Sequence, residues 1–292
     1  MKKSSTSAMI LAAIGLFYTA ATAQAEISNC QVLKTAPVTI SSEGIYCLKS
    51  DIGTLIPTGA AVTIKADNVT LDLNGFSVLG DVTNPGNRTF GIVAENQRNI
   101  TIRNGRVSGF FTGVALTGQN VNGTSTSSGH LIENIKSDRH KFTGITLSGD
   151  NSVVRNNRVL EIAASQNTVV KDAKAILIYN SKNAVVTGNI VSDVKAVGVA
   201  AGIRLDSVEY SDISRNTIQY LTLAQSIIGI SFQTSSWLAI HDNSVLNITG
   251  IGTAGIGEPT GGSAFIGCID NIIAGFIKPT SGCNFVSGNK SF

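Results

Sequence analysis

A short sequence phrase recurs along this chain and constrains its fold more than any other feature. The phrase is a Gly or Ala followed by two apolar residues that flank one variable residue. It occupies residues 91–94, 113–116, 144–147, 175–178, 202–205 and 229–232. The last three copies begin 27 residues apart, and the earlier ones 22 or 31 residues apart. Repetition at a nearly fixed period indicates one repetitive domain.

Two more short apolar segments follow most copies of the phrase. The first lies at 99–102, 152–154, 184–186, 211–213 and 238–240, and the second at 158–159, 190–191, 217–218 and 244–245. Three short strands per period predict a β-solenoid coil, in which equivalent strands pair in parallel about 4.8 Å apart. No segment of helical length has a helical period, and a β-sandwich, the main alternative, requires no fixed period.

Asparagines recur between the second and third strands of each period. Asn157, Asn189, Asn216 and Asn243 are spaced 32, 27 and 27 residues apart, in step with the coils, whereas Asn104 and Asn134 lie one residue out of register. Asn tolerates the left-handed backbone of a sharp turn, and a buried amide must have its hydrogen bonds satisfied. We therefore expect a structural ladder of asparagines, each bonded to its neighbours above and below. A sugar-binding row is the alternative.

Two pairs of segments resemble the repeat of the pectate-lyase-like superfamily of right-handed parallel β-helices. They read GIRL with SDISRNTI (202–205 and 211–218) and AILI with AVVTGNIV (175–178 and 184–191), and residues 62–80 look like the opening coil of that group. The resemblance covers about residues 60–250 and implies an all-β, single-domain right-handed parallel β-helix of about 7–8 coils with capped ends. The superfamily includes lyases, hydrolases, epimerases, esterases, phage tailspikes and non-catalytic surface proteins, so no single activity is implied.

The N-terminus has the three parts of a secretory signal peptide. Lys2 and Lys3 supply positive charge, residues 8–21 are apolar, and Ala23-Gln24-Ala25 forms a small-x-small cleavage site. The apolar stretch is short for a membrane span, so a membrane anchor is the less favoured interpretation. We expect residues 1–25 to be removed, and the mature chain, with no transmembrane segment, to be exported through the inner membrane as a periplasmic or secreted protein.

Four cysteines lie in two local pairs near the ends of the mature chain. Their spacing favours disulfides Cys30–Cys47 and Cys268–Cys283 among the three possible connectivities. A metal site is the alternative, but no CxxC motif or nearby His pair supports it. We expect an N-terminal cap at 26–59, coils at 60–254, and a C-terminal coil and cap at 255–292, because an open solenoid end exposes core and strand edges.

Charge is sparse in this chain and limits the possible partners. Charged residues make up 14% of the sequence, and the formal net charge is +3. Lys and Arg are spread along the chain, which argues against nucleic acid. An acidic polysaccharide is the candidate partner. No motif for a metal or cofactor is recognised, and the oligomeric state is left open.

The densest cluster of functional side chains lies where the third coil turns into the fourth. It contains Asp138, Arg139, His140 and Lys141, and the matching turn one coil later carries Asp172 and Lys174. A uronic-acid lyase or epimerase needs a cation that neutralises the sugar carboxylate and a base that takes the C5 proton. We predict Arg139 and Lys174 as the neutralising groups, His140 or Lys141 as the base, and Asp138, Asp172 and Tyr179 as substrate-binding residues. A solvated turn with ordinary surface charges is the alternative.

Two functions follow from these observations. The first is an exported β-helix protein that binds or modifies an extracellular polysaccharide, as a uronic-acid lyase or epimerase if it is an enzyme. The second is a non-catalytic structural or adhesive protein of the cell surface or periplasm. The sequence lacks the motifs of polygalacturonases, pectate lyases, alginate epimerases and pectin methylesterases, and has one Trp and five Tyr. Whether the protein is an enzyme is therefore left open.

Overall fold

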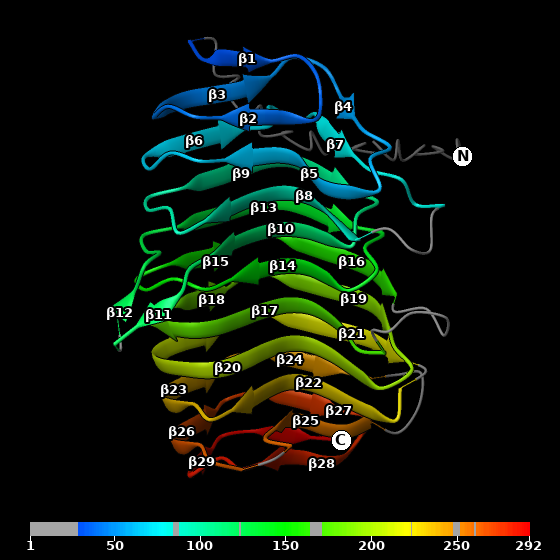
Figure 1. The fold of residues 1–292 in the computed structure, drawn as a ribbon. Helices are drawn as coiled ribbons and strands as arrows, with labels where there is room; N and C mark the ends of the chain where they lie inside the picture. Colours follow the sequence, from blue (N-terminus) through cyan, green and yellow to red (C-terminus); the bar gives the residue numbers. More distant parts are fainter. Residues whose placement is uncertain are drawn as a thin grey trace, which may run out of the picture.

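The computed structural model describes residues 29–83, 88–122, 124–163, 171–222, 224–247, 252–259 and 261–292. These residues form no helix; their strands stack in coils from one end of the molecule to the other (Figure 1). The predicted all-β, single-domain right-handed parallel β-helix is confirmed. The signal peptide predicted at residues 1–25 lies outside the described residues. The described part contains no helix long and apolar enough to cross a membrane.

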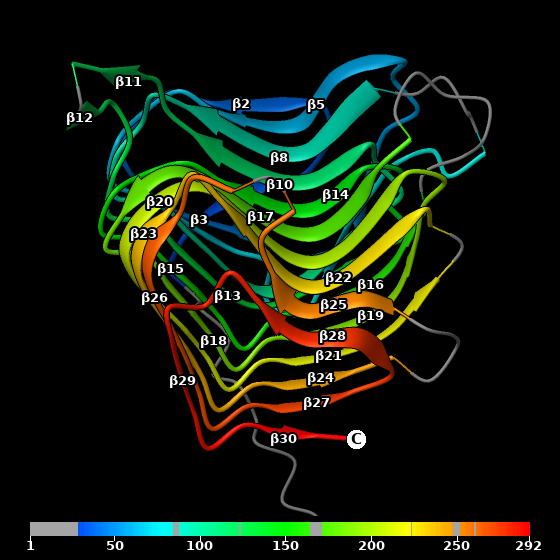
Figure 2. The same cartoon turned by 90° about the horizontal axis from the view of Figure 1, so that it is seen from below.

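Each coil contributes one strand to each of three parallel sheets. The front sheet contains β2 (Val38–Ile40), β5 (Thr58–Ile64), β8 (Arg88–Glu95), β10 (Thr112–Thr117), β14 (Thr143–Leu147), β17 (Ala173–Lys182), the first half of β20 (Val199–Ser214), β22 (Ser226–Gln233), β25 (Gly252–Gly257) and β28 (Phe276–Ser281). Viewed along the stack, these strands form one curved wall around the interior (Figure 2).

The second sheet follows the front sheet in every coil. It contains β1 (Gln31–Leu33), β3 (Gly44–Leu48), β6 (Val69–Asp72), the first half of β9 (Thr101–Ser108), the first half of β13 (Leu131–Asp138), β15 (Val153–Arg155), β18 (Val185–Thr187), the second half of β20, β23 (Ser236–His241), β26 (Ala264–Ile269) and β29 (Phe285–Ser287).

The third sheet closes each coil. It contains β4 (Ile52–Gly53), β7 (Ser77–Leu79), the second halves of β9 and β13, β16 (Arg158–Ala163), β19 (Ile190–Lys195), β21 (Thr217–Thr222), β24 (Ser244–Leu246), β27 (Ile272–Ala274) and β30 (Lys290–Ser291). An antiparallel pair, β11 (Asn120–Val121) and β12 (Thr124–Ser125), projects from the coils.

The core is a set of apolar columns produced by in-register pairing. One column runs down the front sheet through positions that pair strand by strand and are all fully buried: Val62, Ile92, Val114, Ile145, Ile176, Ile203, Ile230 and Ile256. The residues from Ile92 to Ile230 occupy the first apolar position of the repeated phrase, and Val62 and Ile256 extend the column at either end. Each buried methylene contributes about 0.8 kcal/mol, so the repetition of this position explains why the short strands are stable together.

The asparagine ladder lies inside the turn between the second and third sheets. The Nδ2 atoms of Asn157, Asn189, Asn216, Asn243 and Asn271 each donate to the Oδ1 of the next asparagine at 3.0 Å, and the series ends at Asn289. The same Nδ2 atoms also donate to second-strand carbonyls at 2.8–2.9 Å. The predicted structural ladder is confirmed. Asn104 and Asn134 lie outside it, in an exposed pair at 3.3 Å.

The two ends of the helix carry the disulfides. Both predicted pairs, Cys30–Cys47 and Cys268–Cys283, are formed. Short strands before residue 58 and after residue 257 continue the same stack at each end. At the C-terminal end, β28, β29 and β30 each pair on one side, and the side chains of Ile277, Phe285 and Val286 are more than half exposed.

Replacing one ladder asparagine should destabilise the whole helix. Asn216→Ala removes a side chain that donates to Val186 and Asn243 and accepts from Asn189. Buried groups left without partners cost about 1–3 kcal/mol each, so we expect a loss of about 2–4 kcal/mol in the free energy of unfolding. Urea denaturation measures it. The control Gln225→Ala removes an exposed amide and should change stability by less than about 0.5 kcal/mol. Equal losses in the two variants would contradict a stabilising role for the asparagine ladder.

Candidate functional site

The corner between the third and front sheets positions most of the predicted site residues. Arg139, Glu161 and Asp193 follow one another on successive coils, and all three have a left-handed backbone, with φ of 57°, 54° and 56°. Gly109 stands one coil before Arg139 and has φ of 87°, which shows that the bend belongs to the coil geometry. At this bend a side chain is directed outward, so the residue type can vary without altering the core.

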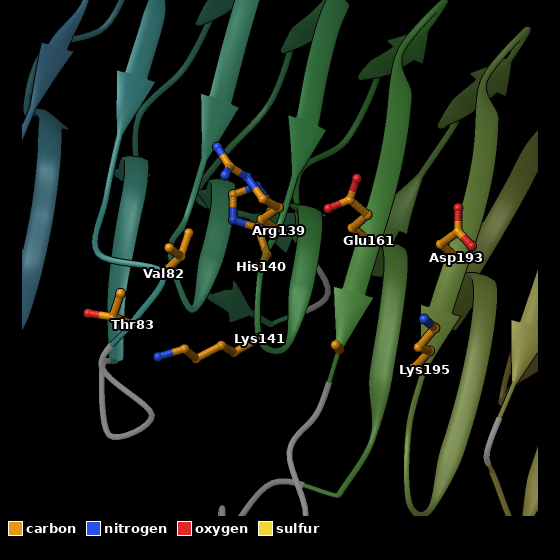
Figure 3. A pocket seen from close by; sticks show the side chains of 9 residues that line it. Val82, Thr83, Arg139, His140, Lys141, Glu161, Asp193 and Lys195 are labelled. Carbon is orange, nitrogen blue, oxygen red and sulfur yellow. The ribbon is translucent and has the colours of Figure 1, made fainter.

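A cavity of about 690 Å³ lies at this corner, and we call it the corner pocket. Its lining comprises Val82, Thr83, Arg139, His140, Lys141, Glu161, Ala163, Asp193 and Lys195. Glu161 and Asp193 project from neighbouring strands, and Lys141 extends toward Thr83 (Figure 3). The lining thus combines three exposed or half-buried cations with two carboxylates.

His140 belongs to the core and borders the pocket only from inside. On its coil His140 occupies the inward position that Ile162 and Val194 occupy on the next two coils, and it is 1% exposed. Its Nδ1 accepts from the Phe110 amide at 3.3 Å, and its Nε2 lies 3.0 Å from Ser137 Oγ and 3.1 Å from the Val107 carbonyl oxygen. Burial lowers the pKa of His140 to about 4. Both ring nitrogens are engaged inside the protein, where a substrate proton cannot reach them.

Asp138 and Lys141 flank His140 in different surroundings. Asp138 is buried and accepts from Arg106 at 2.7 and 3.0 Å. Burial alone would raise the pKa of Asp138, but hydrogen bonds from Arg106 and Ser108 outweigh it and lower the pKa. Lys141 Nζ is shielded from solvent and has no hydrogen-bond partner within the described residues. Burial lowers the pKa of Lys141.

A second hollow follows the outer surface of the front sheet, and we call it the front groove. It consists of two adjoining cavities of about 510 and 390 Å³ that share Phe90, Val93 and Glu95. Its floor contains the outward residues Val93, Ala115, Thr146 and Leu177, which occupy the variable position of the repeated phrase. The groove therefore runs across β8, β10, β14 and β17, along the axis of the helix.

One wall of the front groove is a stack of aromatic and cationic side chains. The rings of Phe111 and Phe142 are stacked, with centroids 5.2 Å apart. The Arg88 guanidinium lies 5.9 Å from the Phe111 centroid, and Lys174 Nζ lies 4.7 Å from the Phe142 centroid. Cation–π contacts of this kind hold charged groups in place while their hydrogen-bonding atoms remain available. These phenylalanines were not predicted as site residues, because they lie in the turn that precedes the repeated phrase.

Tyr179 lies on the opposite wall of the front groove. Burial raises the pKa of Tyr179 and outweighs the hydrogen bonds to Thr117 and Ser148, which lower that pKa. Tyr179 pairs in register with Asp206, and Leu177 with Arg204, on the next strand. Arg204 Nε donates to Asp206 Oδ1 at 2.7 Å, and its side chain also binds Ser231 and Gln233.

Lys174 and Asp172 join this group at the groove edge. Lys174 Nζ lies 3.5 Å from Asp172 Oδ2, and Asp172 Oδ1 accepts from the Val199 amide at 3.0 Å. Burial lowers the pKa of Lys174, and the charge of Asp172 opposes that shift.

The predicted site residues are thus divided between two hollows. Tyr179 lines the front groove, and Lys174 lies beside it on the ring of Phe142, with Asp172 next to Lys174. Arg139 and Lys141 line the corner pocket, and His140 and Asp138 are buried behind that pocket. Arg204 and Asp206 lie on the strand next to the groove lining, as the register partners of Leu177 and Tyr179, and were not predicted as site residues. The place of Arg204 in the outward column after Leu177 was the available signal. Within the described residues no group of His, Cys, Asp and Glu has the arrangement of a metal site.

A family model described as "Right handed beta helix region" matches residues 90–270. The chain belongs to this right-handed β-helix family. The match covers the coils that build both hollows, and it defines a scaffold without an activity. No curated protein matches the sequence.

Three solved structures are similar to this chain at low sequence identity. The Dettilon tailspike protein (gp208) is 18% identical over 89% of this chain with a TM-score of 0.54, and the chain spans 58% of that protein. The Azotobacter vinelandii mannuronan C-5 epimerase AlgE6 A-module is 15% identical over 88% of this chain and 87% of its own, with a TM-score of 0.45. The periplasmic alginate epimerase AlgG is 13% identical over 86% and 69%, with a TM-score of 0.48. At these identities the likeness concerns the fold alone.

Burial of His140 should make the stability of this β-helix protein depend on pH. Because its folded pKa lies below the unfolded value of 6.5, the unfolded chain binds the proton first as the pH falls. Stability is then complete above pH 6.5 and decreases toward pH 4, by up to about 1.4 kcal/mol per pH unit for this residue. In His140→Gln, urea midpoints measured across this range should decrease less steeply than in the wild type. Parallel curves would contradict a neutral buried His140.

Proposed function

We propose that this protein binds an extracellular polysaccharide along the front groove. The observation that carries the proposal is the groove itself, which has an apolar floor, an aromatic–cationic wall and hydroxyl and charged groups on the opposite side. Sugar rings present both C–H surfaces and hydroxyl groups, so they suit a hollow with few polar groups among apolar ones. Export, as the sequence predicts, would place the protein where such polymers occur, and the two disulfides fit an oxidising compartment.

The direction of the groove favours an extended polymer over a small ligand. Equivalent groove residues repeat on every coil, about 4.8 Å apart along the axis. A saccharide chain lying along that axis would meet one strand after another across the floor. Phe111 and Phe142 would contact successive units on one side, and Glu95, Thr117 and Tyr179 would bond hydroxyl groups on the other.

The finer part of the proposal is chemistry on a uronic-acid unit, as a lyase or epimerase. Lys174 and Arg204 would neutralise the sugar carboxylate, and Tyr179 would exchange a proton with the sugar. In β-elimination the base takes the C5 proton, the freed electron pair forms the C4–C5 double bond, and the bond from C4 to the glycosidic oxygen breaks. Tyr179 would pass the proton to that oxygen, so that an unsaturated uronate and a free hydroxyl group result. This assignment keeps Lys174 from the sequence prediction and replaces His140 as the base, because its nitrogens are engaged in the core. Arg139 and Lys141 belong to the other hollow.

Binding should depend on the aromatic wall. We expect Phe142→Ala to weaken binding of alginate or polygalacturonate oligosaccharides about tenfold, since an aromatic contact contributes about 1–1.5 kcal/mol. Isothermal titration calorimetry measures this change. Phe285→Ala, which removes a 62% exposed phenylalanine from the second sheet, is the matched control and should bind like the wild type. Equal affinities for both variants and the wild type would place the ligand elsewhere.

Catalysis should depend on the hydroxyl of Tyr179 and the charge of Arg204. If the protein is a lyase, the unsaturated product absorbs in the ultraviolet, and Tyr179→Phe should slow its release by about 10²–10⁴-fold while binding is largely kept. Arg204→Ala should reduce both rate and affinity, because the carboxylate loses a cation. Unchanged rates in both variants would contradict these roles. Binding without absorbance and without change in uronate stereochemistry would favour the non-catalytic adhesive function.

A further inference from the structure

We propose that the outer surface of the third sheet, together with the corner pocket, is a second site that binds an acidic polysaccharide through its carboxylates. This site does not depend on the front groove. Its core is a column of cations, Arg106, Lys136 and Arg158, which pair in register on successive strands. Arg139, Lys141 and Lys195 continue it into the corner pocket. We call these six residues the basic strip.

The strip has more cations than its own carboxylates can neutralise. Between Arg106 and Lys195 the same surface carries Asp138, Glu161 and Asp193. Asp138 is already engaged by Arg106 and lies 3.5 Å from Lys136 Nζ. Asp51 and Asp81, near Arg106 and Lys141, form the acidic N-terminal boundary of the strip.

The charges in the corner pocket are not paired with one another. Within the described residues no ion pair joins Arg139, Lys141 or Lys195 to Glu161 or Asp193, although all five line one cavity. Elsewhere on this helix, neighbouring charges do pair, as Arg103 with Asp72 at 2.8 Å and Arg155 with Glu133 at 2.8 Å. A shielded Lys141 Nζ without a hydrogen-bond partner in the described structure adds to this pattern. Arg139 Nε donates to Ser108 Oγ at 3.0 Å, and Asp193 Oδ2 accepts from Ser192 Oγ at 2.7 Å, so the other charged atoms of the lining are the ones suited to a ligand that supplies partners.

The spacing of the strip matches a polymer that carries one acid per sugar. The column places one cation on each coil, and coils are about 4.8 Å apart, which is comparable with the length of one pyranose unit along a chain. Carboxylates of a polyuronate lying along the axis would therefore meet Arg106, Lys136 and Arg158 in turn. At the corner pocket, Arg139, Lys141 and Lys195 would bind a carboxylate, and Glu161 and Asp193 would accept hydrogen bonds from hydroxyl groups.

The same features disfavour nucleic acid as the ligand. Proteins that bind single strands stack bases on aromatic rings, and the lining of the corner pocket contains no Phe, Tyr or Trp among the described residues. Glu161 and Asp193 would repel phosphates, which have no hydroxyl group to donate at neutral pH. A uronate sugar offers both the anion and the hydroxyl groups that this mixed set of side chains requires.

Charge reversal on the strip tests the site. Arg158 and Lys195 are exposed, so Arg158→Glu with Lys195→Glu should leave the thermal midpoint unchanged while reducing affinity for polygalacturonate oligosaccharides at least tenfold at low ionic strength. Lys278→Glu with Lys290→Glu changes the net charge equally at exposed positions of the last coil, and should leave affinity within about twofold of the wild type. Binding should also weaken as NaCl increases from ~0.05 to ~0.5 M, because salt screens exposed charges.

The two hollows are distinguished in the same experiment. If the strip is a separate site, Phe142→Ala retains the salt-sensitive binding that the strip reversal removes. Three results would overturn the proposal: no binding of polygalacturonate by the wild type at low salt, equal losses in the two charge-reversed variants, or tighter binding of a single-stranded oligonucleotide of matched charge. The second and third results concern the basic strip alone, whereas the first would also contradict polygalacturonate binding in the front groove.

Discussion

In-register stacking of one coil on the next is the constraint on which the rest of this structure depends. Among the described residues, each strand of the three parallel sheets pairs only with strands of neighbouring coils, and β11 and β12, outside those sheets, pair with each other. The apolar columns and the asparagine ladder hold that register, because a shift of one residue would direct each buried isoleucine outward and leave each buried amide unpaired. Equivalent outward positions therefore recur along the helix at a constant spacing, one on each coil. Both hollows are consequences of that repetition.

The repeated phrase was sufficient to predict the architecture, and the reason is physical. A buried position in a solenoid must be apolar in every coil, so the column from Val62 to Ile256 is visible as a period in the sequence. The ladder was predicted for a similar reason, since a buried amide needs the same amide above and below it. Asn271 and Asn289 extend the ladder beyond the four residues that the spacing identified. The disulfides were predictable because each closes a short loop.

The candidate site was only partly predictable, because the stacking of the coils decides which residues face the same hollow. His140 stood in a run of charged residues and was predicted as a base, yet its register with Ile162 and Val194 places it inside the core. Lys174 and Lys141 lie on neighbouring coils near one corner, but Lys141 lines the corner pocket, whereas Lys174 lies over Phe142, which lines the front groove. Phe111 and Phe142 lie 31 residues apart, like the two copies of the phrase that follow them, so the period of the sequence already aligns them. Their stacking, and the groove that they line, became apparent only with the register of the coils.

The central claim is that the front groove holds a saccharide chain along the helix axis. A crystal structure with a uronate hexasaccharide tests it most directly. The account predicts sugar density across β8, β10, β14 and β17, with a ring against Phe142 and a carboxylate near Lys174 or Arg204. A groove without density in a crystal where the sugar occupies another surface alone, such as the third sheet, would contradict it.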